Sequence, residues 1–185
     1  ILGAGTAGLA ALSEVKKHTD NFLIVNDGPY GTTCARVGCM PSKLLIEAAN
    51  AYHRRGSFDT FGIQGASALS VDFPAVMQRV RAMRDDFVAS TLALTDTLGK
   101  RSMAGRARLR GPDCVEVNGE RLTARAIIIA TGSHPFIPKP WQAFADRVLT
   151  TDTLFEQSRI GPRLGVVGLE PLGAETLVTL ACEGG

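Results

Sequence analysis

The sequence predicts an α/β fold with a parallel sheet, and two observations support this prediction. Residues 1–2 lead through a glycine turn into an amphipathic stretch at residues 9–17, and the apolar residues 22–25 follow. Strand, turn, helix and strand in this order form a βαβ unit, whose two strands pair in parallel. A second apolar run, AIIIA at residues 126–130, is typical of a strand buried within such a sheet.

Between these strands the sequence predicts a helical hairpin and a small antiparallel section. CARVGCMPSK, from residue 34, opens a helix that continues to about residue 54, and Asp72 can cap a further helix. That helix repeats apolar residues at steps of 3, 4, 3 and 4: Phe73, Val76, Val80, Met83 and Phe87. This spacing is typical of a helix packed on another helix, here the preceding one, or alternatively a second copy of the chain. Residues 101–125 predict short antiparallel strands with a turn at Asn118 and Gly119.

The composition excludes several classes of protein. The 185 residues include 20 Lys and Arg against 18 Asp and Glu, a net charge of +2, with 45% hydrophobic and 21% charged residues. These proportions are those of a globular chain and exclude a disordered one. The charge gives no electrostatic case for nucleic acid or an anionic membrane as a partner. Four cysteines are too few for a secreted disulfide scaffold, so we expect a cytoplasmic protein.

Both ends of the sequence look cut. The first residue is Ile, only two apolar residues precede the glycine turn, and the last residues, 183–185, directly follow an apolar stretch. We therefore expect a piece of a longer protein, with one domain in residues 1–157 and the start of a second in residues 158–185. In the second domain, residues 164–168 predict a strand, and a helix begins at about residue 174.

The sequence GAGTAG at residues 3–8 fits the pattern G-x-G-x-x-G between a strand and a helix. Gly3 permits the tight turn, Gly5 lets the backbone approach a pyrophosphate, and Gly8 lets the helix lie close to the strand. The helix N-terminus adds N–H groups and a partial positive charge. The pattern therefore predicts a dinucleotide site; the alternative is a glycine-rich turn without a ligand.

The end of the second strand departs from this pattern. An acidic residue normally stands there and accepts hydrogen bonds from ribose hydroxyls, whereas this chain has Asn26 followed by Asp27. An amide can hydrogen-bond a hydroxyl but carries no charge, so we expect a weaker ribose contact.

Cys34 and Cys39 are five positions apart. In an ideal helix, the geometry places their Cα atoms ~8.7 Å apart, beyond the ~7 Å limit for a disulfide. Either the two thiols are not bonded, or Gly38 and Pro41 distort the helix between them. A helix start and the nearby Arg36 favour a thiolate, and a strained disulfide of this kind is typical of redox chemistry. The alternative is a pair of small buried residues.

GTTCARVGCMPSK at residues 31–43, following GAGTAG, resembles the pyridine nucleotide-disulfide oxidoreductases that carry a C-x4-C redox disulfide. The resemblance covers the whole chain, including ATGS at residues 130–133. It implies a Rossmann-like three-layer FAD/NAD(P)-binding fold with a parallel sheet, a helical hairpin and a small antiparallel section. The ending PSK is more similar to dihydrolipoamide dehydrogenase and mercuric reductase than to glutathione reductase.

The resemblance also implies roles for individual residues. Cys34 would be the thiol that exchanges with the substrate, and Cys39 the sulfur on the flavin side. Lys43 would lie near the flavin N5, and Thr33 near the flavin and pyrophosphate. The other FAD-site residues that it implies are Gly3, Gly5, Thr6, Ala7, Gly8, Asn26, Asp27, Gly31, Thr32, Ala107, Ala130, Thr131, Gly132 and Ser133. Outside these sites we predict small buried cysteines and surface histidines: Cys114, Cys182, His18, His53 and His134.

Two further positions depart from the family pattern. Thr32 replaces the second glycine of the family's GG[ST]C loop, which affects the close approach of the loop to FAD. In the second glycine turn, Glu170 replaces the middle glycine and would oppose a pyrophosphate, and Pro171 removes an N–H donor. The family's NAD/NADP-selecting strand and its interface domain, with a His–Glu pair across a dimer, would lie beyond Gly185. We therefore expect no turnover by this piece alone.

The sequence thus favours an FAD-dependent oxidoreductase that passes electrons between NAD(P)(H) and a dithiol or disulfide substrate, with dihydrolipoyl dehydrogenase as the first candidate. The alternatives are a mercuric or other small-disulfide reductase of the same family, or a catalytically silent flavin-binding module, which Asn26 and Glu170 motivate. We expect FAD as the cofactor, NAD(P) in the full-length protein, a lipoyl-type substrate and a homodimer. We expect no metal site.

Overall fold

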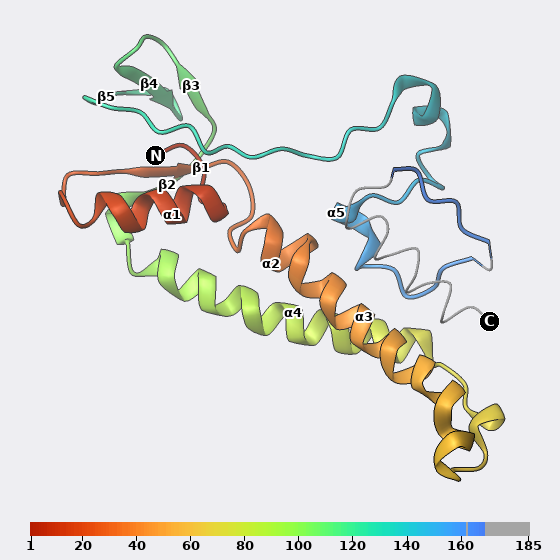
Figure 1. The fold of residues 1–185 in the computed structure, drawn as a ribbon. Helices are drawn as coiled ribbons and strands as arrows, with labels where there is room; N and C mark the ends of the chain where they lie inside the picture. Colours follow the sequence, from red (N-terminus) through yellow and green to blue (C-terminus); the bar gives the residue numbers. More distant parts are fainter. Residues whose placement is uncertain (162, 169–185) are drawn as a thin grey trace. The chain divides into compact units, whose positions relative to one another are not determined.

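The computed structural model describes residues 1–161 and 163–168 (Figure 1). The chain forms two compact units, and each is assembled from two separate stretches of sequence. The first unit comprises Ile1–Cys34 and Asp86–Phe136. The second comprises Ala35–Asp85 together with the described residues from Ile137 onward.

The first unit contains a parallel sheet. Strands β1 (Ile24–Asn26) and β2 (Ser102–Ala104) pair in parallel. Leu2 forms parallel bridges with Val25 on one side and Ile129 on the other. If the four strand segments are numbered along the chain, their order across the sheet is therefore third, second, first and fourth. This order, 3-2-1-4, is that of the first four strands of a dinucleotide-binding α/β sheet, and it confirms the predicted parallel pairing.

The predicted strand at residues 126–130 is only partly confirmed. Leu2 donates a backbone hydrogen bond to Ile128, and Ala130 donates one to Leu2, each 2.8 Å long. Ile129, however, is 62% exposed, so the prediction of a buried strand is wrong. Within the described residues this segment pairs only with Leu2; Ile127 packs against the cluster of Val25 and Val117, whereas Ile128 and Ile129 are exposed. Strand β2 lies within the range predicted to be antiparallel, and its place in the parallel sheet was not predicted, because its three residues contain no apolar run.

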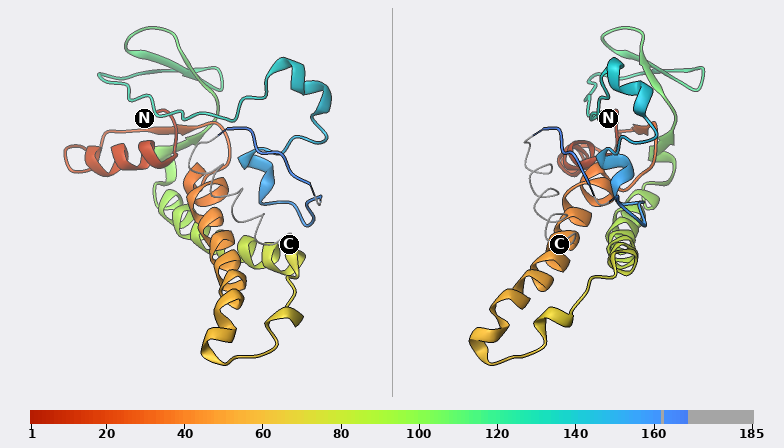
Figure 2. Two further views of the ribbon diagram at one scale, coloured as in Figure 1. Left: turned by 45° about the vertical axis from the view of Figure 1, so that its right-hand side comes forward. Right: turned by 90° about the vertical axis from the view of Figure 1, so that its right-hand side faces the viewer.

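The two faces of the parallel sheet are covered by different elements. Ile24 and Val25 point to opposite faces, because side chains alternate along a strand. Ile24 packs with Leu12 of α1 (Thr6–Val15), and Val25 packs with Val115 and Val117. Figures 1 and 2 show α1 and the strands β3–β5 on opposite sides of the parallel strands. The helix begins at Thr6 rather than residue 9, so half of the glycine motif lies within it.

The antiparallel section predicted for residues 101–125 is confirmed for residues 107–123, whereas residues 102–104 pair in parallel with β1. Strands β3 (Ala107–Leu109), β4 (Cys114–Val117) and β5 (Glu120–Thr123) form a three-stranded antiparallel sheet. The predicted turn has φ values of +52° at Asn118 and +85° at Gly119, as a type I′ hairpin requires. The side-chain nitrogen of Asn118 also donates a hydrogen bond of 2.9 Å to the carbonyl of Ala104, which ties the hairpin to the end of β2.

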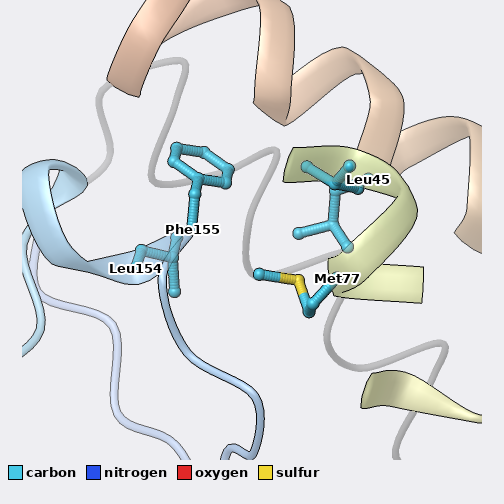
Figure 3. Packing of buried hydrophobic residues seen from close by; sticks show 5 residues of the cluster. Leu45, Met77, Leu154 and Phe155 are labelled. Atoms are coloured by element: carbon cyan, nitrogen blue, oxygen red, sulfur yellow. The ribbon is translucent and has the colours of Figure 1, made fainter. Parts of the chain in front are cut away.

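The second unit is built around the predicted helical hairpin. Helices α3 (Cys39–His53) and α4 (Phe73–Asp96) contribute Leu45, Met77 and Val80 to one buried cluster, which Leu154 and Phe155 complete (Figure 3). The carboxylate of Asp72 accepts a hydrogen bond of 3.1 Å from the backbone of Ala75, so the predicted cap is confirmed.

The predicted seam of α4 needs a correction. Met77 is fully buried although the sequence pattern did not include it, and Phe87, which the pattern included, is 41% exposed. A straight helix repeats every 3.6 residues, so a strict alternation of 3 and 4 drifts away from the buried face. Among the described residues, the other members of the cluster contact only the first half of α4. Phe87 lies in the second half and is not part of the cluster.

Two arginines of α4 hold the short helix α5 (Thr151–Leu154) and the residues that follow it. Arg81 donates hydrogen bonds of 3.3 Å to the carbonyls of Phe155 and Gln157. Arg84 forms ion pairs with Asp85 and Glu156. Burial opposes the charge of Arg84, but the hydrogen bonds that Arg84 donates to both carboxylates raise its pKa above the ordinary value, so this guanidinium stays charged.

The remaining described segments are short. Four 3-10 helices occur at Arg54–Phe61, Ala66–Ala68, Gly99–Arg101 and Lys139–Phe144. Phe136 is 82% exposed, which confirms the predicted surface connection at residues 133–142. The predicted strand at residues 164–168 is wrong, because no strand forms there and Val167 is exposed. The helix predicted from residue 174 lies outside the described residues, among which no helix is long and apolar enough to cross a membrane.

Candidate dinucleotide-binding site and cysteine pair

The predicted nucleotide-binding residues of the first unit gather at the carboxyl ends of the parallel strands. Gly3 follows the first strand segment, Asn26 ends β1, and Ala130 ends the fourth segment. The chain leaves the first segment toward β1, while the fourth segment lies on its other side. In open α/β sheets, ligands bind outside the carboxyl ends at such a change of direction. In this sheet, that point lies between Gly3 and Ala130.

Two glycines of the turn are required by the packing of the backbone itself. A Cβ on Gly3 would lie 2.1 Å from the carbonyl oxygen of Ala130, and one on Gly8 would lie 1.8 Å from that of Gly3. Gly5 is different, because a Cβ there would have no neighbouring atom within 4 Å. Its missing side chain leaves open space beside the start of α1, which is the space that a pyrophosphate needs. The turn therefore fits a dinucleotide such as FAD.

The N-terminus of α1 is suited to an anion. Gly5 is its N-cap, no side chain caps it, and its first turn contains no acidic residue. Thr6 and Ala7 are exposed, and the first amide of the helix with an intrahelical bond is that of Leu9, which donates to Gly5. The backbone N–H groups at a helix N-terminus and the partial positive charge there favour a phosphate.

The end of β1 is occupied by two polar residues with different surroundings. The Asn26 side-chain oxygen accepts a hydrogen bond of 2.9 Å from the amide of Ala4, and its nitrogen donates one of 2.9 Å to the carbonyl of Gly28. Asp27 is exposed, and its carboxylate lies 3.7 Å from Nε of Arg106. Arg106 was not predicted as a site residue, because it lies two residues after β2, whose place in the parallel sheet was not predicted.

The segment 130–133 lies against the glycine turn. The Cα atom of Thr131 would be 3.2 Å from a Cβ on Gly3. Thr131, Gly132 and Ser133 are exposed, and Gly132 has φ +69°. Ala107, in contrast, pairs with Val117 in the antiparallel sheet and packs against the apolar cluster there, so its side chain has a packing function.

The loop between β1 and α2 (Thr33–Val37) has an unusual backbone. Gly28 and Gly31 have φ values of +135° and +107°, and Thr32 has φ +59°. A β-branched residue in the left-handed region is an outlier, at a cost of about 1–2 kcal/mol. The position at which this chain departs from the family's glycine is therefore a position whose backbone favours glycine.

The helix that carries the two cysteines is interrupted between them. α2 ends at Val37, α3 begins at Cys39, and Gly38 separates them with φ −131° and ψ −117°. The helix is thus interrupted at Gly38, as one of the two alternatives left open by the sequence requires. Pro41 does not break α3, because it lies in the first turn, where no intrahelical N–H donor is needed.

Cys39 is an exposed free cysteine at the first position of α3. The Ser42 hydroxyl donates a hydrogen bond of 3.1 Å to the carbonyl of Cys39, and the Ser42 amide donates one of 3.2 Å to Gly38. Ser42 is buried, so these bonds fix the first turn below the thiol, while Lys43 is exposed.

The structure distributes the predicted site residues over both units. The glycine turn, Asn26, Asp27, residues 130–133 and Cys34 belong to the first unit, whereas Cys39 and Lys43 belong to the second. The three histidines are exposed, as predicted: His18, His53 and His134. Cys114 is half-buried, which agrees in part with the prediction of a buried cysteine. Cys182, Glu170 and Pro171 lie outside the described residues.

Comparisons with known proteins identify the family of this chain. The sequence matches the family described as "Pyridine nucleotide-disulphide oxidoreductase" over residues 1–181. It is 30% identical over 176 residues to a mercuric reductase of Lysinibacillus sphaericus, covering 95% of this chain and 32% of the relative. It is 27% identical over 179 residues to a dihydrolipoyl dehydrogenase of Mycoplasma pneumoniae, covering 95% of this chain and 39% of the relative.

A solved structure has the same fold. The HOCl-induced flavoprotein disulfide reductase RclA from Escherichia coli matches with a TM-score of 0.76 and 20% identity, covering 99% of this chain and 39% of that one. The chain spans about a third of the length of these relatives, between 32% and 39%. Since the family match extends over almost the whole sequence, this chain belongs to the pyridine nucleotide-disulphide oxidoreductase family.

Proposed function

We propose that this chain is the FAD-binding part of an FAD-dependent oxidoreductase that passes electrons between NAD(P)(H) and a dithiol or disulfide substrate. Residues 1–157 form its three-layer FAD-binding domain, and residues 158–185 begin its nicotinamide-binding domain. The observation that carries the proposal is the glycine turn at the carboxyl edge of a 3-2-1-4 sheet, beside open space at Gly5.

Bound FAD would supply a two-electron carrier between a dithiol and a nicotinamide. The N-terminus of α1 and the exposed residues after the fourth strand segment supply N–H and hydroxyl donors for its phosphates. The residues that would hold FAD are Gly3, Gly5, Thr6, Ala7, Gly8, Asn26, Asp27, Gly31, Thr32, Thr33, Lys43, Ala107, Ala130, Thr131, Gly132 and Ser133.

The cysteine pair would exchange electrons with the substrate by thiol–disulfide exchange. One substrate thiolate attacks Sγ of Cys34 in the oxidised pair, forms a mixed disulfide and displaces the Cys39 thiolate. The second substrate thiolate attacks the substrate sulfur of that mixed disulfide and releases the Cys34 thiolate. Two electrons pass from the substrate to the pair, one substrate disulfide forms, and the two substrate protons are released to solvent or to the new thiolates.

Dihydrolipoyl dehydrogenase is the first candidate for the activity of the whole protein, with a lipoyl group as substrate, a homodimer as assembly and the cytoplasm as location. The ending PSK at residues 41–43 supports it. Mercuric reductase is the second candidate, because two mercuric reductases are 30% and 31% identical to this chain. Two assays of the complete protein separate these candidates: reduction of NAD by dihydrolipoamide, and reduction of Hg(II) by NADPH.

A visible absorption spectrum tests the proposal. In the protein expressed from its complete reading frame, we expect flavin bands, and about one equivalent of a dithiol should produce a long-wavelength shoulder from a thiolate beside the flavin. Flavin without the shoulder would remove the cysteine pair from the proposal. Absence of flavin, also after reconstitution with FAD, would refute the FAD assignment.

A pair of cysteine variants tests the relay. Cys39→Ser should abolish the shoulder and lower disulfide reductase activity by at least about a hundredfold, because no intramolecular disulfide can form. Cys114→Ser is the control, since Cys114 lies in β4 of the antiparallel sheet, and we expect it to retain both properties. Unchanged activity of Cys39→Ser would indicate a flavin-binding module without this redox chemistry.

A further inference from the structure

The end of β1 departs from the acidic residue that normally binds a ribose, and the structure shows what the replacing residue does. The Asn26 side chain uses its oxygen as an acceptor for the Ala4 amide and its nitrogen as a donor to the Gly28 carbonyl. A carboxylate could accept the first bond but has no hydrogen for the second, and two acceptors would then face each other. The hydrogen bonding at this position therefore requires an amide.

These two bonds join the glycine turn to the loop after β1. Ala4 is buried between Gly3 and Gly5, and Gly28 has φ +135° at the start of the loop. Asn26 consequently fixes the conformation of the turn. Its oxygen keeps one lone pair and its nitrogen keeps one N–H, but neither group carries a charge, so a ribose hydroxyl would be bound more weakly here than by a carboxylate.

A charged acceptor stands directly beside it. Asp27 follows the carboxyl end of β1, and Arg106 follows that of β2, the neighbouring strand in register. The two ends are tied by a backbone hydrogen bond of 2.9 Å from Gly105 to Asn26. The Asp27 and Arg106 side chains are 59% and 77% exposed and lie 3.7 Å apart, so their ion pair is weak and leaves carboxylate oxygens open to a ligand.

From this arrangement, and on the basis of the FAD-binding function proposed above, we infer that the two tasks of the strand end are divided between neighbouring residues. Asn26 is a positioning residue that holds the glycine turn. Asp27 accepts hydrogen bonds from the vicinal hydroxyls of the adenosine ribose of the dinucleotide, and Arg106, 3.7 Å away, orients the Asp27 carboxylate toward this edge of the sheet.

Flavin affinity of the complete apoprotein tests the inference, with fluorescence quenching by added FAD and FMN as the readout. FMN lacks the adenosine, so it reports on the rest of the site. Asp27→Asn should weaken FAD binding about tenfold, the typical effect of losing a charged acceptor, and leave FMN affinity and the apoprotein melting temperature unchanged. Asp27→Glu should restore most of the FAD affinity, and Arg106→Gln should weaken it about threefold.

Asn26→Asp provides the opposite signature. Because it loses the donor to Gly28, we expect a lower melting temperature of the apoprotein and weaker binding of both flavins. Wild-type FAD affinity in Asp27→Asn would overturn the inference, as would a stable Asn26→Asp protein with tighter FAD binding, since the ribose contact would then lie at residue 26. A wild-type protein that binds neither flavin would refute the proposed function and the inference together.

Discussion

Gly8 lies so close to Gly3 that a Cβ on Gly8 would be 1.8 Å from the carbonyl oxygen of Gly3. The first turn of α1 is thus packed directly on the backbone of the first strand segment. Because the obstacle is backbone, a side chain at residue 8 would force the helix away from the sheet. The last glycine of the motif is therefore fixed by packing within the protein, independently of any ligand.

Gly8→Ala and Gly5→Ala separate the two functions of the glycine turn. We expect Gly8→Ala to destabilise the complete protein by about 3 kcal/mol or more, because the helix must shift. Gly5 has φ −79° and open space where a methyl group would lie, so Gly5→Ala should melt like wild type but bind FAD more weakly. Thermal melting and FAD titration of both variants provide the check. Equal melting temperatures for the two would contradict the packing argument.

Thr32→Gly is expected to stabilise the protein. Relief of the left-handed strain at φ +59° outweighs the larger chain entropy of glycine, with a net gain of about 0.5–1 kcal/mol. Thr33→Gly is the control, because Thr33 begins α2 and glycine there should destabilise the helix. Urea denaturation of the apoproteins measures both changes. A loss of stability in Thr32→Gly would show that the contacts of the threonine exceed its backbone cost.

The helical hairpin can be tested at the two positions where pattern and structure differ. Met77 is fully buried in the cluster with Leu45, so Met77→Ala should cost about 2–5 kcal/mol. Phe87 is 41% exposed, and Phe87→Ala should cost less than half as much, although the side chain removed is larger. Denaturant unfolding of the two variants gives the comparison. A larger loss of stability in Phe87→Ala than in Met77→Ala would support the alternating pattern of buried residues that the sequence predicted.

The Arg110–Glu116 pair predicts a pH dependence. Arg110 donates hydrogen bonds of 3.1 and 2.8 Å to the Glu116 carboxylate, and these hold the pKa of Glu116 below its usual value. A depressed pKa in the folded state stabilises the protein above the ordinary glutamate pKa, and this contribution disappears as the pH falls through the lowered pKa.

Arg110→Gln should therefore melt below wild type at pH 7, and the difference should shrink to zero in acid. Melting curves of wild type and variant between neutral pH and about pH 3 measure it, and an NMR titration of the Glu116 carboxyl gives the pKa directly. Arg125→Gln, at an exposed residue after β5, is the control. A difference that stays constant with pH would exclude the ion pair as its cause.

The local and short-range features of this protein could be predicted from its sequence. The glycine turn, the cap at Asp72, the hairpin turn at Asn118 and Gly119, and the helix break at Gly38 all depend on the backbone preferences of single residues. The parallel pairing of the first strands could also be predicted, because the strands of a βαβ unit pair in parallel. Together with the cysteine spacing, these patterns were enough to indicate the family.

Tertiary structure alone decided which side chains these elements bring together. Strand β2 has only three residues and no apolar run, yet its pairing with β1 brings Arg106 beside Asp27. The amide of Asn26 appeared in the sequence as a weaker ribose ligand, and only the hydrogen bonds to Ala4 and Gly28 show it holding the turn. Met77 replaced Phe87 in the core because burial depends on where the partners of α4 end. Contacts between residues distant in the chain are set by packing, and one sequence pattern is compatible with many of them.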